Sequence, residues 1–267
     1  MITTYQPAPD IDVLTSAFPI PGLGLVPINA FVMHGDEPIL VDTGVVVERD
    51  EFLEVLRTVV DVADLRWIWL THTDADHIGA LHALLDENAD LKIVTTFLGV
   101  GAMSLADPLP LDRVHLVNPG QQLEAGDRTL TALRPPTFDN PCTTGFYDGR
   151  SGALFSADSF GALLADVPQS AEELTEAELQ EGQALWATLD SPWLQSVDAD
   201  TFAGQLDGIR RLDPSMILSS HLPAASATLT ERMLAMLAAV PERPSFAGPD
   251  QAALELLLAG MTTGAPA

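Results

Sequence analysis

The sequence predicts an α/β fold built from layers of strands and helices. In the first half, short apolar runs alternate with amphipathic segments, and the middle of the chain is rich in short strands. The alternation of strand and helix appears again late in the chain. A chain of 267 residues, 47% of them hydrophobic, can bury one large core. We therefore expect a single domain over residues 1–267, with two or four layers.

The first half alternates strands with helices. A buried strand over 38–44 leads into a glycine-containing loop, and further strands are expected over 66–70 and 91–96. The segment after the first strand has the i, i+3, i+4, i+7 spacing of an amphipathic helix: Phe52, Val55, Leu56 and Val59. A second helix follows residue 70, with apolar positions at Ile78, Leu81, Leu84 and Leu85.

The second half is richer in strands. Short strands are expected over 113–117, 128–133, 144–148 and 152–158, and Asp148-Gly149 favours a hairpin turn. Residues 161–200 form an acidic insert that we expect to be partly helical. A helix behind the N-cap Asp198 precedes a strand over 215–220, and helices follow around 228–239 and 249–260.

The net charge and the cysteine content limit which binding partners and which cellular location we expect for the protein. There are 12 basic and 38 acidic residues, and the formal charge of −26 repels phosphate backbones and anionic lipid, so we expect no nucleic-acid or membrane partner. The single Cys142 excludes an internal disulfide, and the N-terminus shows no secretory signal. Prolines and glycines interrupt the uncharged run over 18–35, which therefore cannot span a membrane as a helix. A cytoplasmic location is expected.

The stretch THTDADHIG, residues 71–79, concentrates groups that can bind metal. His72, Asp74 and Asp76 alternate at the end of a predicted strand, and His77 stands where the next helix should begin. Alternate residues of an extended loop point the same way, so one loop can serve two metal ions. The alternative is a helix capped by Asp74 or Asp76 with histidines on the surface. Four ligand-type residues in six positions favour the metal loop.

Four motifs in succession resemble the metallo-β-lactamase superfamily: LVDTG with Asp42, HTDADH, LFSADSF with Asp158, and ILSSHLP with His221. The resemblance covers residues from about 28 to 225 and implies a four-layer αββα sandwich with a dinuclear site at one edge of the sheets. It implies that His72 and Asp74 bind the first metal, and that Asp158 bridges. It places Asp76, His77 and His221 on the second metal, and Asp42 beneath the site as a structural residue.

Two departures from the zinc hydrolases of that superfamily concern the ligands. Asp74 stands where a histidine is common, and the middle histidine is missing from TFDNPCTTGFYD, where Asp139 takes its place, with Asn140 or Cys142 as further substitutes. A carboxylate at this ligand position resembles the ligand pattern of the diiron branch of the superfamily. That branch is the lactamase-like domain of flavodiiron proteins. Four aspartates supply hard oxygen ligands that favour iron or manganese, while zinc stays open. The missing middle histidine also leaves open that the first metal is bound weakly or not at all.

Three functions follow from this ligand set. Hydrolysis of a small ester, lactone, thioester or phosphoester by a metal-bound hydroxide is placed first, because it is the superfamily's commonest chemistry. Asp74 and Asp76 are its predicted catalytic residues, and Asp74 or Asp139 would assist proton transfer if it is not a ligand. The second function is binding or reduction of dioxygen or nitric oxide at a diiron centre. The third is a non-enzymatic sensing module with a degenerate site.

The redox function needs an electron donor. Flavodiiron proteins commonly hold a flavin in a flavodoxin-like domain, for which the 267 residues leave no room. We therefore expect a partner protein, or the facing subunit of a homodimer, to supply the electrons.

Overall fold

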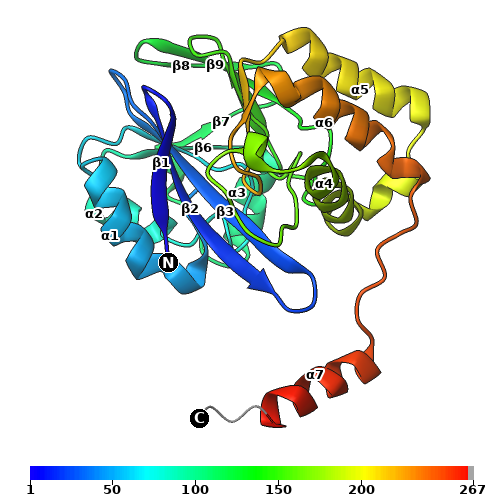
Figure 1. Cartoon of the computed structure of the whole chain (residues 1–267). Coiled ribbons are helices and arrows are strands. Elements are labelled where there is room, and N and C mark those ends of the chain that lie inside the picture. The colour runs from blue at the N-terminus through cyan, green and yellow to red at the C-terminus, as the bar shows by residue number, and fades with distance from the viewer. Residues whose placement is uncertain (264–267) are drawn as a thin grey trace.

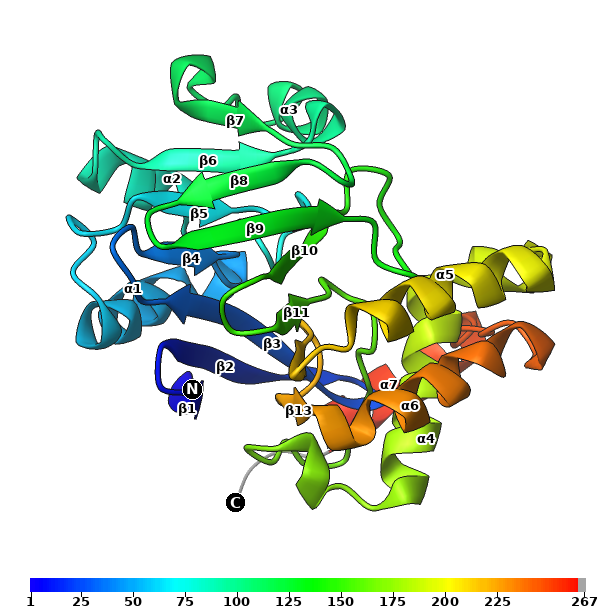
Figure 2. The same cartoon turned by 90° about the horizontal axis from the view of Figure 1, so that it is seen from above.

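Two β-sheets lie face to face in this computed structural model, which describes residues 1–263 (Figures 1 and 2). The first sheet runs in the order β1 (Thr3–Ala8), β2 (Ile11–Ile20), β3 (Gly24–Met33), β4 (Ile39–Val41), β5 (Trp67–Trp69), β6 (Lys92–Thr95), β7 (Val114–Leu116). The second contains β8 (Gln122–Ala125), β9 (Arg128–Leu133), β10 (Gly145–Asp148), β11 (Ala153–Phe155), β12 (Met216–Leu218) and β13 (Ala225–Ser226), in the order β13-β12-β11-β10-β9-β8. Strands β4 to β7 are parallel to one another, as are β11 and β12.

Helices cover the outer face of each sheet. Figures 1 and 2 show α1 and α2 on one side of the sheets and α4, α5 and α6 on the other. The helices are α1 (Arg49–Val59), α2 (Leu81–Glu87), α3 (Phe97–Ser104), α4 (Glu176–Asp190), α5 (Ala199–Leu212), α6 (Ala227–Ala238) and α7 (Gln251–Thr263). Short 3-10 helices are η1 (Val46–Glu48), η2 (Leu111–Arg113), η3 (Ala171–Glu173), η4 (Pro192–Ser196) and η5 (Val240–Glu242).

Successive residues of a strand pack in different layers of the core, one against the outer helices and the next between the two sheets. On β4, Leu40 packs with Phe52 of α1, whereas Val41 lies between the sheets. On β11, Leu154 packs among residues of α4, α5 and α6, whereas Phe155 lies between the sheets. Both faces of these strands are buried, which explains why the strands are continuous apolar runs in the sequence. The four-layer αββα architecture is confirmed.

The first three strands differ from the sequence-based expectation, which contained no strand before residue 38. Residues 11–33 form a long hairpin in which Pro19 lies opposite Leu25 and Pro27 opposite Ala17. The prolines that exclude a spanning helix therefore do not exclude strands. Proline has no amide hydrogen for the ladder, but an antiparallel strand needs that hydrogen only at the bonded positions.

The segment after β5 also departs from expectation. Residues 74–80 form turns, and α2 begins at Leu81 with Ala80 as an N-cap that makes no side-chain bond, so the predicted helix start at His77 and Ile78 is wrong. The turns pair with the loop after β4 instead: Thr43 N donates to His77 O at 2.7 Å and Gly79 N to Gly44 O at 2.8 Å. Helix capping by Asp74 or Asp76 is therefore excluded, and the loop is free to carry ligands.

The expected helices of the second half are present. Asp198 caps α5 by accepting a hydrogen bond from Thr201 N, and the acidic insert over 161–200 contains α4. Two helices, α6 and α7, close the described part of the chain, and Figure 1 shows α7 standing apart from the sheets. Among the described residues, none of the helices combines the length and apolar character that crossing a membrane requires. The organisation of residues 1–267 as one domain stays a prediction.

Candidate metal centre

The carboxyl ends of four strands meet at one edge of the two sheets. Asp42 follows β4, residues 71–77 follow β5, Asp158 lies just beyond β11, and His221 lies just beyond β12. Strands β4 and β5 are parallel, as are β11 and β12, so the loops that leave each pair emerge on one side. Segments far apart in the sequence thus bring their polar residues together.

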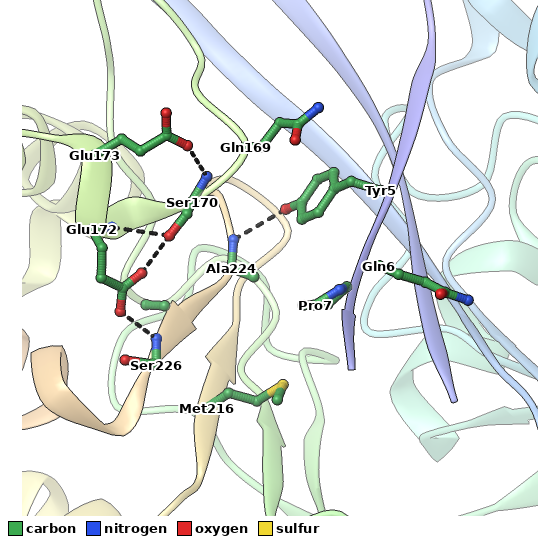
Figure 3. A pocket seen from close by; sticks show the side chains of 11 residues that line it. Tyr5, Gln6, Pro7, Gln169, Ser170, Glu172, Glu173, Met216, Ala224 and Ser226 are labelled. Atoms are coloured by element: carbon green, nitrogen blue, oxygen red, sulfur yellow. Dashed lines mark hydrogen bonds between the residues drawn. The ribbon is translucent and has the colours of Figure 1, made fainter. Parts of the chain in front are cut away.

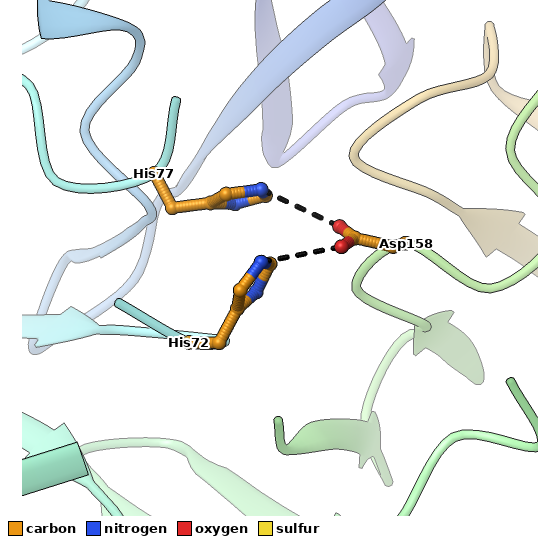
Figure 4. Close-up of side chains that lie close together, drawn as sticks. All are labelled: His72, His77 and Asp158. Carbon is orange, nitrogen blue, oxygen red and sulfur yellow. Dashed lines mark ion pairs between the residues drawn. The ribbon is translucent and has the colours of Figure 1, made fainter. Parts of the chain in front are cut away.

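Asp158 stands between three buried histidines, two of which appear with it in Figure 4. Asp158 Oδ2 lies 3.2 Å from His72 Nε2, whereas Oδ1 lies 3.4 Å from His77 Nε2 and 3.2 Å from His221 Nε2. Asp76 Oδ2 approaches the same two nitrogens, at 3.4 Å from His77 Nε2 and 3.5 Å from His221 Nε2. Asp76, His77 and His221 therefore form one ligand group around Asp158.

A second group lies on the other side of Asp158. His72 Nε2 is 3.9 Å from Asp74 Oδ2 and 3.9 Å from Asp139 Oδ1. The structure thus places Asp139 beside His72, and its role as the substitute for the middle histidine stays a prediction. The side chains of Asp74 and Asp139 are 41% and 34% exposed, so this side of the cluster is open to solvent.

Asn140 and Cys142, the further substitutes for the middle histidine, lie outside the cluster. Asn140 Nδ2 donates to Asp74 Oδ1 at 2.9 Å, and the buried Cys142 Sγ donates to Asn140 Oδ1 at 3.0 Å. Both side chains therefore support Asp74 rather than face the histidines.

Buried partners orient the histidine rings. Asp42 accepts hydrogen bonds from Thr71 N at 2.8 Å and Thr71 Oγ1 at 2.7 Å, and its Oδ2 lies 2.8 Å from His77 Nδ1. His221 Nδ1 donates to Pro27 O at 2.8 Å. A ring held through Nδ1 presents Nε2 to the centre, which is the usual arrangement behind a metal-binding histidine. Asp42 thus lies beneath the site, as expected.

Replacing Asp42 with Asn should weaken manganese(II) binding about 10- to 100-fold, because the amide holds the His77 ring less firmly than the carboxylate does. Asn also tolerates the positive φ of 57° at this position. Titration of the metal-free protein with manganese(II) measures the change. The exposed Asp36, replaced with Asn, is the matched control and should bind like the unchanged chain; equal affinities for the two variants would contradict the role of Asp42.

The charges of the cluster favour a cation. Burial, together with the nearby charges of Asp158 and Asp74, raises the pKa of Asp139 to about 7. Burial raises the pKa of Asp158, but the neighbouring histidines His72, His221 and His77 lower it below the ordinary value. His77 Nε2 and Asp158 Oδ1 are buried without a hydrogen-bond partner among the described residues. Two ligand atoms without partners beside crowded carboxylates fit a bound metal.

One acidic residue near the cluster was not singled out from the sequence. Asp190 ends α4 and is 7% exposed, and one oxygen each of Asp139, Asp158 and Asp190 lie within 4.8 Å of one another. Burial, followed by the charges of Asp158 and Asp139, raises the pKa of Asp190 to about 8. The sequence signal was an aspartate in the last turn of a helix, where the helix dipole disfavours a negative charge.

A separate pocket shares no residue with the predicted metal ligands. Figure 3 shows this pocket, which is bordered by β1, by the segment of Ser170 and Glu172, and by β13. The Tyr5 hydroxyl accepts a hydrogen bond from Ala224 N at 3.1 Å, and burial raises the Tyr5 pKa to about 12. Among the described residues, those that line this pocket form none of the candidate metal-ligand groups.

Solved structures share the fold. The rubredoxin oxygen:oxidoreductase from Desulfovibrio gigas superposes with a TM-score of 0.75 and 19% identity, covering 90% of this chain and 62% of that one. The flavodiiron protein from Giardia intestinalis superposes with a TM-score of 0.76 and 16% identity, covering 91% of this chain and 60% of that one. These likenesses show the metallo-β-lactamase fold of the flavodiiron core.

Curated relatives match part of their own length. An anaerobic nitric oxide reductase flavorubredoxin from Klebsiella pneumoniae is 28% identical over 171 residues, which are 63% of this chain and 36% of that protein. An uncharacterized protein from Methanocaldococcus jannaschii is 26% identical over 195 residues, which are 72% of this chain and 48% of that protein. The chain thus spans less than half the length of either relative.

A family model adds a match that contains the whole cluster. The model described as ODP family beta lactamase matches residues 26–221, from within the long β3 strand to His221 itself. The matched range therefore includes every residue predicted to bind metal. The chain belongs to the ODP family of beta lactamases.

Proposed function

We propose that this chain holds a carboxylate-rich diiron centre that binds and reduces dioxygen or nitric oxide with electrons from a separate donor protein. The observation that carries the proposal is the composition of the two ligand groups. His72, Asp74 and Asp139 form one group, and the second consists of Asp76, His77 and His221. Asp158 lies between both groups, within 3.4 Å of all three histidines.

The donor atoms fit iron better than zinc. Four aspartates and three histidines supply more hard oxygen than imidazole ligands, and hard ligands suit iron or manganese. Four carboxylates also offset the charge of two divalent ions. The buried His77 Nε2 and Asp158 Oδ1, which make no hydrogen bond among the described residues, are atoms that such ions would bind.

The comparisons support the redox reading over the hydrolytic one that the sequence analysis placed first. Relatives are named as nitric oxide reductases, and a structural neighbour is named as an oxygen:oxidoreductase. Those names belong to proteins longer than this chain, so the activity is our proposal for it. Asp74 and Asp76 were predicted both as metal ligands and as catalytic residues of hydrolysis, and we keep only the ligand role in this proposal.

The chain's residues would define where a small molecule reaches the centre. A bound pair of iron ions would supply the redox chemistry. The exposed side chains of Asp74 and Asp139 border the open side. Trp186, which is 8% exposed, covers His221, with the two ring centroids 4.5 Å apart. A diatomic molecule would therefore enter past Asp74 and Asp139.

The overall reactions set the requirement for a donor. Reduction of one dioxygen to two waters takes four electrons and four protons. Reduction of two nitric oxides to nitrous oxide and one water takes two of each. A reduced flavin-bearing or rubredoxin-like protein is the class of donor that we propose, and supply by the facing subunit of a homodimer stays a prediction.

Metal analysis with activity assays tests the proposal. Protein produced with iron, manganese and zinc all available should contain about two irons per chain, because the ligands are mostly carboxylates. With a reductant it should consume dioxygen or nitric oxide and leave a panel of esters and lactones intact. Two zincs with ester hydrolysis would instead support the hydrolase, and absence of metal would leave only the non-enzymatic module.

A further inference from the structure

We infer that Asp190 is an additional carboxylate ligand of the centre, on the side of the first metal ion. The inference rests on the dinuclear centre of the proposed function. It assigns a metal-binding role to a residue in the acidic insert, outside the motifs that carry the family resemblance.

The geometry places Asp190 within reach of the same ion as two proposed ligands. One carboxylate oxygen each from Asp139, Asp158 and Asp190 lie within 4.8 Å of one another. Oxygen ligands lie roughly 2.0–2.5 Å from a hard divalent ion, so two of them are at most about 4–5 Å apart. Asp139 belongs to the group with His72 and Asp74, which places Asp190 on that side.

The surroundings of Asp190 leave its charge uncompensated. Ser191 Oγ donates to Asp190 Oδ2 at 2.8 Å, and no lysine or arginine of the described residues forms an ion pair with this carboxylate. The side chain is 7% exposed and stands at the C-terminal end of α4, where the helix dipole is negative. Burying such a charge beside two other carboxylates is costly unless a cation is near.

An independent observation indicates that the space beside Asp190 takes a ligand. Asp158, which borders Asp190, is 2% exposed, and its Oδ1 atom lacks a hydrogen-bond partner among the described residues. His77 Nε2, 3.4 Å from that oxygen, is also buried and makes no hydrogen bond among the described residues. Asp158, one oxygen of which lies within 4.8 Å of an Asp190 oxygen, thus carries a buried ligand atom that a cation would satisfy.

Two tryptophans fix Asp190 in this position. Trp186, four residues earlier on the same face of α4, donates from Nε1 to Asp158 O at 3.0 Å. Trp193 in η4, three residues after Asp190, donates from Nε1 to Phe138 O at 2.7 Å. Asp190 thus lies between an anchor on the Asp158 loop and an anchor next to Asp139, so the helix end is held against both.

The test compares Asp190→Asn with Glu181→Gln, an exposed change on the same helix, in the full chain. Metal-free protein is titrated with manganese(II), with free ion measured by electron paramagnetic resonance, and thermal unfolding is recorded without metal. Asp190→Asn should weaken at least one of the two manganese sites about tenfold or more. Its metal-free form should unfold at the same or a higher temperature, because asparagine keeps the size of the buried side chain and removes only its ionisable group. Glu181→Gln should bind like the unchanged chain.

The outcomes separate this inference from the proposed function. If Asp190→Asn binds two manganese ions with unchanged affinity, Asp190 is not a ligand, while the dinuclear centre stands. A lower unfolding temperature of metal-free Asp190→Asn would assign the residue a structural role and overturn the inference. If the unchanged chain binds neither manganese nor iron, the proposed function fails first.

Discussion

Replacing Asp158 with Asn should reduce the bound metal from about two ions per chain to less than one, and abolish reduction of dioxygen or nitric oxide. Asp158 is the carboxylate that lies within 3.4 Å of all three clustered histidines. In the proposed centre Asp158 would contribute to both ligand groups, and its negative charge would offset the repulsion between two cations. An amide carries no charge and has one oxygen, so it cannot serve both ions. The loss should exceed the roughly 10- to 100-fold effect of removing an outer-shell partner.

The exposed Asp166, changed to Asn, is the matched control for this experiment. Metal content by elemental mass spectrometry and far-ultraviolet circular dichroism should be measured on both variants. Full metal content in folded Asp158→Asn protein would rule out Asp158 as the bridge. An unfolded variant would require the comparison to be repeated with His77→Ala, which removes a ligand from the second group only.

Replacing Arg128 with Met should lower the free energy of unfolding by about 3–5 kcal/mol, the usual cost of leaving one partner of a buried ion pair alone. The Arg128 side chain is 1% exposed and pairs with Asp148, which is fully buried, and with Asp10. It also donates to His34 O at 2.8 Å. Asp148 ends β10 of the second sheet, whereas Asp10 lies in the turn between β1 and β2 of the first. The arginine therefore joins the two sheets.

Arg150→Met is the matched control, because Arg150 is 45% exposed and pairs with Asp127 at the surface. Exposed ion pairs contribute about 0–1 kcal/mol, so this variant should lose little stability. Urea denaturation of the metal-free proteins measures both changes. Equal losses in the free energy of unfolding for the two variants would show that Arg128 does not stabilise the packing of the two sheets.

The sequence determined much of the fold because both faces of the central strands are buried. Within the predicted strands 38–44 and 66–70, the residues 39–41 and 67–69 are apolar throughout, and that continuity predicted both strands. The hairpin over 11–33 was not predicted, because Pro19 and Pro27 are breakers by local propensity. Pairing with neighbouring strands outweighs that propensity, and such pairing is not visible in a local pattern.

The sequence also identified the candidate ligands that follow strands directly. In HTDADH the chain itself sets the spacing of His72, Asp74 and Asp76, and four motif positions were recognisable by resemblance. It did not determine where α2 begins, because residues 74–80 pair with the loop after β4 and α2 therefore starts at Leu81.

Only the tertiary structure decided which residues of distant loops join the centre. It places Asp139 beside His72 and turns Asn140 and Cys142 towards Asp74 instead. It brings Asp190 to Asp139 and Asp158 through the docking of α4, which no spacing along the chain encodes. Short-range spacing fixes the direction of side chains within one loop, whereas the meeting of loops depends on how helices and sheets pack.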